Sequence, residues 1–338
     1  MLSILLGLAV LVFLAYKGYN IIWVAPAAAM IVAVAGGLGL FDAYTELYMD
    51  GLVGFAKSWF PVFLFGAVFG KLMEVTGLAS SVAKMLAGII GSKRAILAVV
   101  IACAVLTYGG VSLFVVVFAI YPLALELYKE ADISRKLIPG AIALGSFTMT
   151  ALPGSPQLNN LIAARYLGTT AMAAPVLGIT AAVIMLAGGI VYLTWREKQL
   201  RAAGEHYTST GDEKKSDGEA LPHWIFGILP LVAVIITLNV FQWPAIGAIG
   251  TGILLIVLCN IRQWKKFIPA MNDGAQGSVM AIMNTSAAVG FGSVVKAVPG
   301  FASLTSALLG MGGSPLVSEA VAITTLAGAT GSSSGGMT

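Results

Sequence analysis

Residues 150–160 read Thr-Ala-Leu-Pro-Gly-Ser-Pro-Gln-Leu-Asn-Asn, and they lie between two apolar runs, Leu137–Met149 and Leu161–Gly168. Neither run crosses a membrane alone, because a helical crossing needs about 20 residues. The two runs together make one span with an unwound middle. Two prolines remove backbone donors there, and the freed carbonyl groups survive at membrane depth only where protein or water surrounds them. The stretch predicts either a broken transmembrane helix of the type that holds substrates in transporters or a loop between two short buried helices.

Composition indicates a membrane protein. Hydrophobic residues make up 58% of the 338 residues and charged residues only 10%, against about 45–50% and 25% in soluble proteins. The mean hydropathy is +0.93. The net charge of +4 does not indicate a nucleic-acid partner, because the basic residues lie in loops between apolar runs. We therefore expect an all-α polytopic membrane protein whose partner is the lipid bilayer.

Apolar runs divide the chain into spans and one longer hydrophobic segment. We expect spans at Leu2–Tyr16, Ile21–Leu40, Trp59–Val75, the broken Leu137–Gly168, Ala171–Trp195, His223–Phe241, Pro244–Asn260 and Ser278–Val295. The run Ala95–Leu127 is too long for one span and is interrupted by residues 108–112, which favours a re-entrant hairpin. With this hairpin, all but three of the 19 basic residues are cytoplasmic, the exceptions being Lys57, Arg165 and Lys296. The positive-inside rule therefore favours the hairpin over a true crossing.

The chain divides into two halves at its one long hydrophilic segment. Residues 201–221 are rich in charged and small polar residues, and they predict a flexible cytoplasmic linker. The first half, residues 1–200, contains expected scaffold spans over residues 2–40 and a transport part over residues 58–195. The second half, residues 222–338, is expected to be a truncated second copy, in which the C-terminal part of the repeat is missing.

The two halves repeat at an offset of about 222 residues. The matched pairs are Asp50-Gly51 with Asp273-Gly274, Gly54 with Gly277, Phe69-Gly70 with Phe291-Gly292, Gly77 with Gly300, Gly91-Ser92 with Gly313-Ser314, and residues 108–112 with residues 330–334. The expected spans of the first half cross the membrane an odd number of times, so the second copy enters upside down. Inverted repeats with re-entrant hairpins and broken helices are the architecture of many secondary transporters.

Two glycine-rich hairpin tips carry the first group of candidate binding residues. Glycine lacks a Cβ atom and lets backbone approach a ligand closely, and hydroxyl groups both donate and accept hydrogen bonds. These features are typical of a site for a small polar anion, although small residues also allow tight helix packing. The candidate substrate-binding residues at the tips are Gly109, Gly110, Ser112, Gly331, Ser332, Ser333 and Ser334.

The broken span carries the second group of candidates. Gly154 offers close backbone approach, while Ser155, Gln157, Asn159 and Asn160 offer hydroxyl and amide groups that can hold a carboxylate without a buried fixed charge. Asn159 and Asn160 could instead cap the following helix. Gln157 is the central candidate.

Charged residues and enzyme motifs narrow the function further. Asp50 and Asp273 precede glycines at the edges of expected spans, where helix N-capping is the expected role, and Glu74 and Glu319 are candidates for a proton carrier. Both histidines lie in or beside the linker, and the tips lack the Gly-Lys-Ser/Thr of a P-loop. We expect no catalytic residues and no metal site, and hence a protein that is not an enzyme.

Two stretches of the chain resemble signature sequences of the gluconate permease (GntP) family. They are Thr150–Gln157 with the following Asn159-Asn160, and Ala329–Thr338. The resemblance covers essentially the whole chain, and it implies uptake of gluconate or a related hydroxy acid, typically with protons, across the bacterial inner membrane. The family belongs to a broader ion-transporter superfamily, which implies paired hairpins, elevator-type movement and a scaffold homodimer. The chain departs from the sugar-acid permeases at residues 108–112, where those proteins carry an acidic residue before the glycine, so the resemblance does not single out gluconate.

The resulting hypothesis is a symporter for a small organic anion, either gluconate-like or a short hydroxy monocarboxylate such as 3-hydroxybutyrate. The expected coupling ion is H⁺, with Na⁺ as an alternative, and no other cofactor is expected. Two other hypotheses stay open: a sodium/proton exchanger of the same superfamily shape, and a membrane scaffold that transports nothing.

Overall fold

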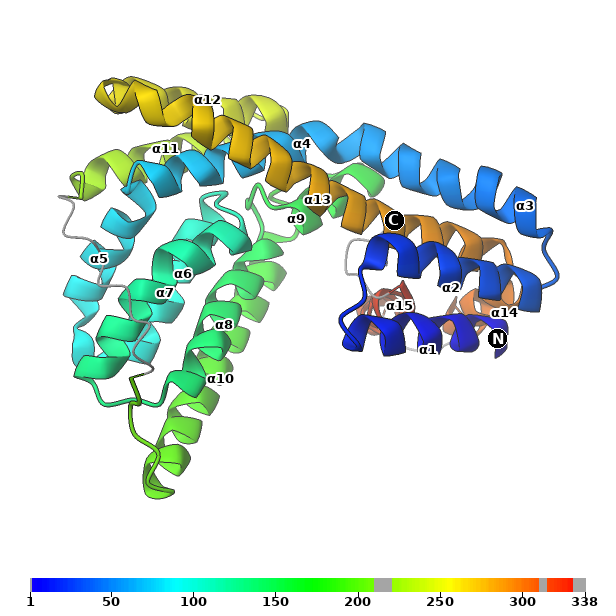
Figure 1. The fold of residues 1–338 in the computed structure, drawn as a ribbon, viewed down its shortest axis with the longest axis horizontal. Helices are drawn as coiled ribbons and strands as arrows, with labels where there is room; N and C mark the ends of the chain where they lie inside the picture. The colour runs from blue at the N-terminus through cyan, green and yellow to red at the C-terminus, as the bar shows by residue number, and fades with distance from the viewer. Residues whose placement is uncertain (1, 210–220, 310–314, 331–338) are drawn as a thin grey trace. The chain divides into compact units, whose positions relative to one another are not determined.

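The computed structural model describes residues 2–209, 221–309 and 315–330. Every regular element within these ranges is helical, as expected. The helices are α1 (Leu2–Tyr16), α2 (Ile21–Ala35), α3 (Leu40–Asp42), α4 (Met49–Val75), α5 (Leu78–Ile90), α6 (Ala95–Tyr108), α7 (Leu113–Glu130), α8 (Ile138–Thr150), α9 (Leu158–Tyr166), α10 (Pro175–Ala202), α11 (Trp224–Asn239), α12 (Ala245–Cys259), α13 (Trp264–Ala297), α14 (Pro299–Leu309) and α15 (Pro315–Thr330) (Figure 1). Short π-helical and 3₁₀ turns lie between some of them.

The chain forms two compact units. Unit 1 contains residues 1–63 and 277–338, and unit 2 contains residues 64–276. The long helices α4 and α13 run across these limits, so each unit contains part of both. Each unit therefore combines segments from the two halves of the sequence.

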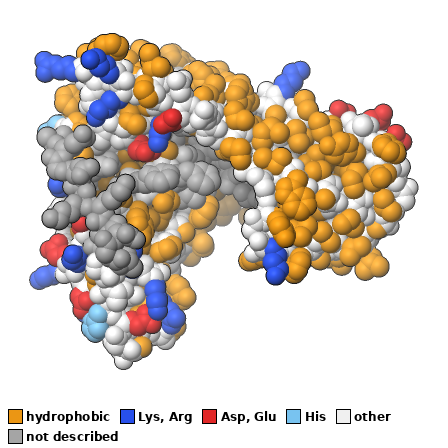
Figure 2. Space-filling model, in the orientation of Figure 1, with side chains coloured by type: hydrophobic (Ala, Val, Ile, Leu, Met, Phe, Trp, Pro, Cys, Tyr) orange, Lys and Arg blue, Asp and Glu red, His pale blue; other side chains and the backbone are white. Residues whose placement is uncertain are grey.

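Three helical segments in the described part of the chain are long and apolar enough to cross a membrane. They are Leu40–Val75, Pro175–Ala202 and Ile261–Ala297. The number becomes four if α5 and the helix that ends at Tyr108, which meet at a bend of 100°, form one span. Hydrophobic side chains cover much of the visible surface, as Figure 2 shows, and this agrees with a polytopic membrane protein.

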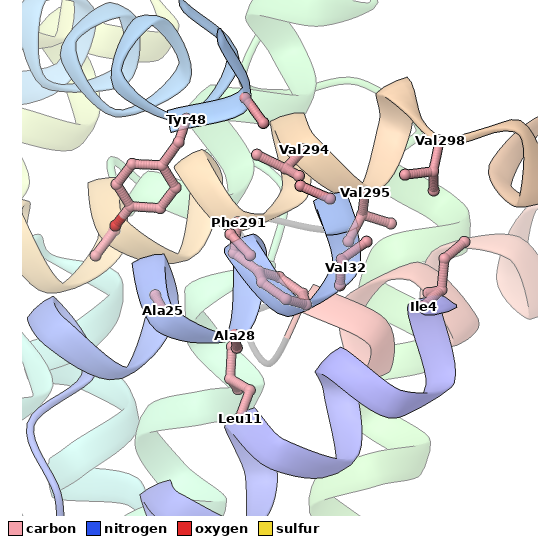
Figure 3. Close-up of a cluster of buried hydrophobic side chains, with 14 of the residues drawn as sticks. Ile4, Leu11, Ala25, Ala28, Val32, Tyr48, Phe291, Val294, Val295 and Val298 are labelled. Carbon is pink, nitrogen blue, oxygen red and sulfur yellow. The ribbon is translucent and has the colours of Figure 1, made fainter. Parts of the chain in front are cut away.

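Unit 1 is organised around a buried aromatic ring. Phe291 on α13 is fully buried and packs in one cluster with Leu11 of α1 and with Ala28 and Val32 of α2 (Figure 3). Close packing of α1 on α2 depends on Gly7, since a Cβ atom there would lie 3.1 Å from the carbonyl oxygen of Ala28 and would overlap Val32. Aromatic and aliphatic side chains thus bury the apolar faces of three helices against one another.

The first part of α4 crosses the last part of α13 within unit 1. A Cβ atom on Gly51 would overlap the Ser293 side chain and would lie 3.3 Å from the Cα of Gly290. A Cβ atom on Gly290 would in turn lie 2.8 Å from the carbonyl oxygen of Tyr48. Glycines at the crossing therefore let the two backbones approach closely, as small residues do between membrane helices.

Unit 2 contains the α6–α7 hairpin together with α8 and α10. α6 packs against both α7 and α8, and α8 packs against α10 (Figure 1). Gly145 allows the close approach of α8 to α6, because a Cβ atom there would overlap the carbonyl oxygen of Val100. This group of helices positions the broken loop that precedes α9.

The α11–α12 pair covers a second side of unit 2. Phe69 on α4 is fully buried, and a Cβ atom on Gly252 of α12 would lie 2.7 Å from its ring. α11 packs on α5, where a Cβ atom on Gly227 would lie 2.8 Å from the carbonyl oxygen of Leu78. A Cβ atom on Gly274 of α13 would lie 2.9 Å from the Cα of Val68, so α13 and α4 also cross closely in this unit.

The helix bounds correct two expectations. The span expected at Trp59–Val75 belongs to a helical segment that begins at Leu40, and the span expected at Ser278–Val295 belongs to one that begins at Ile261. Asp50 and Asp273 therefore lie inside long helices, and the N-capping role expected for them is wrong. In sequence, these polar residues resemble the ends of spans. Both helices continue through them, because exposed polar side chains do not interrupt a helical backbone.

The first residues of the expected linker are held by the loop between α7 and α8. The His206 side chain lies 2.7 Å from one Asp132 carboxylate oxygen, and the Tyr207 backbone N–H donates to the other at 3.2 Å. Lys136 and Glu205 form an ion pair of 2.6 Å nearby. The hydrogen bond with the His206 side chain, followed by that from the Tyr207 backbone, lowers the pKa of the Asp132 carboxyl from its usual value. Residues 210–220 lie outside the described residues.

Candidate binding site at the broken loop

The helix breaks where the sequence predicts. α8 ends at Thr150, α9 begins at Leu158, and residues 151–157 between them are not helical. Pro153, Gly154, Ser155 and Pro156 are all buried, so this irregular backbone is surrounded by protein. The loop therefore needs internal partners for its polar groups.

Gly154 is the conformational centre of the loop. Its φ is +84°, a left-handed conformation that glycine adopts without steric cost. A Cβ atom there would lie 2.8 Å from the Met172 methyl carbon, 2.9 Å from the Tyr108 hydroxyl oxygen and 3.3 Å from Asn239 Nδ2. Three segments distant in sequence thus meet around one residue without a side chain.

Polar side chains bind the loop carbonyl groups. Tyr108 donates its hydroxyl to the Pro153 carbonyl at 3.2 Å, and Asn239 Nδ2 donates to the Gly154 carbonyl at 2.8 Å. Asn160 Nδ2 donates to the carbonyls of Ser155 and Ala171 at 2.9 Å and 2.8 Å. Asn160 therefore stabilises the loop from inside α9, and neither Asn160 nor Asn159 occupies the N-cap position, which belongs to Gln157.

Gln157 joins the broken loop to the tip of the α6–α7 hairpin. Its Nε2 donates to the Thr107 carbonyl at 2.8 Å and to the Val111 carbonyl at 3.2 Å. Val111 directly precedes Ser112, the N-cap of α7, while Gln157 is the N-cap of α9. One side chain therefore spans the distance between two helix N-termini, whose first backbone N–H groups have no partners within their own helices.

The hairpin tip packs closely against the broken loop and against α11. Gly110 has φ +103°, and a Cβ atom there would lie 3.1 Å from Pro156 Cγ. A Cβ atom on Gly109 would lie 2.6 Å from the Leu231 side chain of α11. The structure thus brings Gly109, Gly110 and Ser112 together with Gly154, Ser155 and Gln157. The other predicted tip, Gly331, Ser332, Ser333 and Ser334, lies outside the described residues.

Two buried polar atoms beside this assembly have no hydrogen-bond partner among the described residues. They are the hydroxyl oxygen of Thr107 and Oδ1 of Asn239. Neither residue was predicted from the sequence, and Tyr108 was not predicted as a partner of the loop. Thr107 and Tyr108 directly precede the predicted tip, and this proximity was the available signal. For Asn239, the sequence offered only an amide side chain at the end of an apolar run.

Comparison with known proteins shows which family these features belong to. Residues 1–247 match the family described as "GntP family permease", and this range contains the loop, the first tip and Asn239. The chain is 40% identical to the "Uncharacterized transporter YxjC" of Bacillus subtilis (strain 168), in an alignment that covers the whole chain and 81% of that relative. It is 26% identical to an "Uncharacterized transporter" of Haemophilus influenzae, over 69% of the chain and 54% of that relative. The chain belongs to the GntP family of permeases, as the resemblance of its sequence predicted.

Proposed function

We propose that the protein is a secondary symporter that takes up a small organic anion with protons across the bacterial inner membrane. The proposed substrate is a short hydroxy monocarboxylate or a gluconate-like acid. The observation that carries the proposal is the pair of hydrogen bonds from Gln157 Nε2 to the Thr107 and Val111 carbonyls. These bonds hold the N-termini of α7 and α9 beside each other at the buried, non-helical loop between α8 and α9.

Paired helix N-termini suit a carboxylate. Each N-terminus presents free backbone N–H groups and the positive end of a helix dipole, so an anion there is stabilised without a basic side chain. A neighbouring charge contributes about 0.3–1 kcal/mol per helix end at exposed sites and about 2 kcal/mol when partly buried. Thr107 adds a buried hydroxyl without a partner among the described residues. Such modest interactions favour a ligand that binds and is released again, as transport requires.

The repeated architecture supports an inverted-repeat transporter. Gly51 and its repeat mate Gly274 each lie at a close crossing of α4 and α13, whereas their neighbours Gly54 and Gly277 face open space. The fully buried rings of Phe69 and Phe291 likewise pack on α12 and α2, which are repeat mates. Reciprocal contacts of this kind are what two interlocked copies related by a two-fold axis would make. On this proposal the second tip completes the binding site, and the tips move with the substrate against a dimeric scaffold.

Uptake into proteoliposomes tests the proposed function. Labelled gluconate and labelled 3-hydroxybutyrate are offered in separate experiments, with an inward proton gradient and then an inward sodium gradient. Accumulation that depends on the proton gradient supports the proposal, whereas dependence on the sodium gradient supports the alternative coupling ion. Proton flux driven by sodium without either acid would favour the sodium/proton exchanger. No flux under any gradient would favour the scaffold.

A further inference from the structure

Asn239 is held at the end of α11 by two hydrogen bonds from the same nitrogen. Its Nδ2 donates to the Gly154 carbonyl at 2.8 Å and to the Ile235 carbonyl, one turn earlier, at 2.9 Å. Gln242 Nε2 donates to the Asn239 carbonyl at 2.6 Å and fixes the following turn. The side chain therefore has a defined position beside the broken loop.

The orientation of this amide follows from its partners. Both partners of Nδ2 are carbonyl oxygens, which only accept hydrogen bonds, so the nitrogen must face them and Oδ1 must face the other way. Oδ1 is buried and has no partner among the described residues. If Nδ2 and Oδ1 exchanged places, the carbonyl oxygens of Gly154 and Ile235 would both face an oxygen instead of a donor.

The polar groups around Gly154 supply no donor for Oδ1. The Tyr108 hydroxyl donates to the Pro153 carbonyl, and the Gly154 N–H donates to the Ala171 carbonyl at 2.7 Å. Both amide hydrogens of Asn160 have carbonyl partners as well. A buried acceptor without a donor is unfavourable, so a residue in this state indicates a partner that arrives from elsewhere.

We propose that Oδ1 of Asn239 accepts a hydrogen bond from a hydroxyl group of the transported anion, and that Asn239 thereby selects hydroxy acids over the same acids without the hydroxyl. The inference rests on the proposed function, since it places the anion at the broken loop. The carboxylate binds at the N-termini of α7 and α9, and the hydroxyl faces α11. Asn239 is then a specificity-determining residue supplied by the second half of the sequence to a loop of the first half.

Met172 lies against the same glycine as Asn239. The Met172 methyl carbon lies 2.8 Å from the position that a Cβ atom on Gly154 would occupy, and Asn239 contacts the same glycine. A methionine side chain is unbranched and flexible, so it moves aside at low cost. We therefore expect a substrate that approaches Gly154 to displace the Met172 side chain.

Asn260 provides a matched control. It follows the last residue of α12 and donates its Nδ2 to the Ile256 carbonyl one turn earlier at 3.0 Å, as Asn239 does with Ile235 at the end of α11. Among the described residues, Asn260 makes no hydrogen bond to the broken loop, and its Oδ1 is not a buried oxygen without a partner. Asn260→Ala thus reproduces the local effect of removing an asparagine at a helix end.

The experiment measures hydroxyl preference in proteoliposomes. Uptake of labelled 3-hydroxybutyrate is inhibited with unlabelled 3-hydroxybutyrate or with butyrate, which lacks the hydroxyl, and the preference is the ratio of the two half-inhibitory concentrations. We expect a preference of about tenfold or more in the wild type, because a buried acceptor left unpaired by butyrate disfavours it. Asn239→Ala should bring the ratio close to one, and Asn260→Ala should leave it unchanged.

The possible outcomes separate this inference from the proposed function. A ratio within about twofold of one in the wild type overturns the inference without any variant. An Asn239→Ala protein that keeps the wild-type ratio overturns it too and leaves the proposed function intact. Failure of the wild type to take up either hydroxy acid overturns both.

Discussion

Gln157 Nε2 lies 2.8 Å from the carbonyl oxygen of Thr107, and this hydrogen bond joins the broken loop to the tip of the α6–α7 hairpin. The same nitrogen reaches the Val111 carbonyl at 3.2 Å. Thr107 and Val111 are both fully buried, so water cannot replace the amide easily. Gln157 therefore links the broken loop to the hairpin tip beside two helix N-termini, and its proposed role is to position them.

Gln157→Ala should weaken transport by separating the two helix ends. The change leaves the buried Val111 carbonyl without its donor, at a cost of about 1–3 kcal/mol, and leaves the Thr107 carbonyl with only the Gly110 N–H. We expect at least a tenfold fall in the Vmax/KM for 3-hydroxybutyrate uptake, since about 1.4 kcal/mol corresponds to tenfold. Gln199→Ala serves as the control, because the Gln199 side chain is exposed and accepts a hydrogen bond from Arg196, far from the loop in sequence. Unchanged uptake by Gln157→Ala would contradict the bridging role.

Gly110→Ala and Gly154→Ala should each destabilise the site. Both glycines have left-handed φ values, of +103° and +84°, and a methyl group would meet Pro156 or Tyr108. Backbone strain of this kind costs about 1–3 kcal/mol. We expect a lower melting temperature in detergent and reduced uptake.

Gly88→Ala is the matched control for the two glycine variants. Gly88 lies in α5, where a Cβ atom would have nothing within 4 Å. Alanine favours a helix over glycine, so we expect an unchanged or slightly higher melting temperature. Equal loss of stability in all three variants would indicate that the left-handed backbone is not the cause.

Gly51→Val and Gly274→Val should both disturb the crossing of α4 with α13. A side chain at either position meets the backbone or a short side chain of the facing helix, and overpacking costs about 1–3 kcal/mol. Gly54→Val and Gly277→Val should be tolerated, because nothing lies within 4 Å of either position. Melting temperatures of the four variants check this pairing. A drop at only one of Gly51 and Gly274 would contradict the reciprocal packing of the two repeats.

Asp132 should hold the start of the linker in a pH-dependent way. Its pKa is lowered by the hydrogen bond with the His206 side chain, so its contribution is present above the usual carboxyl pKa of about 4 and is lost as the pH falls through the lower value in the folded protein. His206→Ala should raise this pKa and move the loss to higher pH. Hydrogen exchange at the Tyr207 amide, which donates to Asp132, measures the change. Asp132→Asn should speed exchange at neutral pH, and asparagine tolerates the φ of +53° at this position.

Much of the fold follows from hydrophobic pattern. The spans expected at His223–Phe241 and Pro244–Asn260 correspond closely to α11 and α12, because flanking polar residues and prolines limit both runs. The starts of α4 and α13 could not be predicted in the same way. Asp50 and Asp273 resemble helix starts in sequence, but both helices continue through these exposed residues, and the neighbouring glycines lie at the close crossings of α4 with α13.

The site was predictable in its location and less so in its detail. Pro153 and Pro156 required a break in the helix, and Gly154 indicated a turn there. Both hydrogen bonds of Gln157 Nε2 go to backbone carbonyls of the hairpin. These contacts depend on how the hairpin packs against the loop, which no local sequence pattern encodes. Asn239 lies about 80 residues from the loop in sequence, and only the packing of α11 brings the two together.

The position of bound substrate tests the central claim most directly. A structure of the protein determined with 3-hydroxybutyrate bound, in lipid nanodiscs, would locate the carboxylate. We expect its oxygens to accept hydrogen bonds from backbone N–H groups at the start of α7 or α9, beside Gln157. A carboxylate bound away from both helix ends, with the Gln157 bridge intact and nothing between the two N-termini, would contradict it.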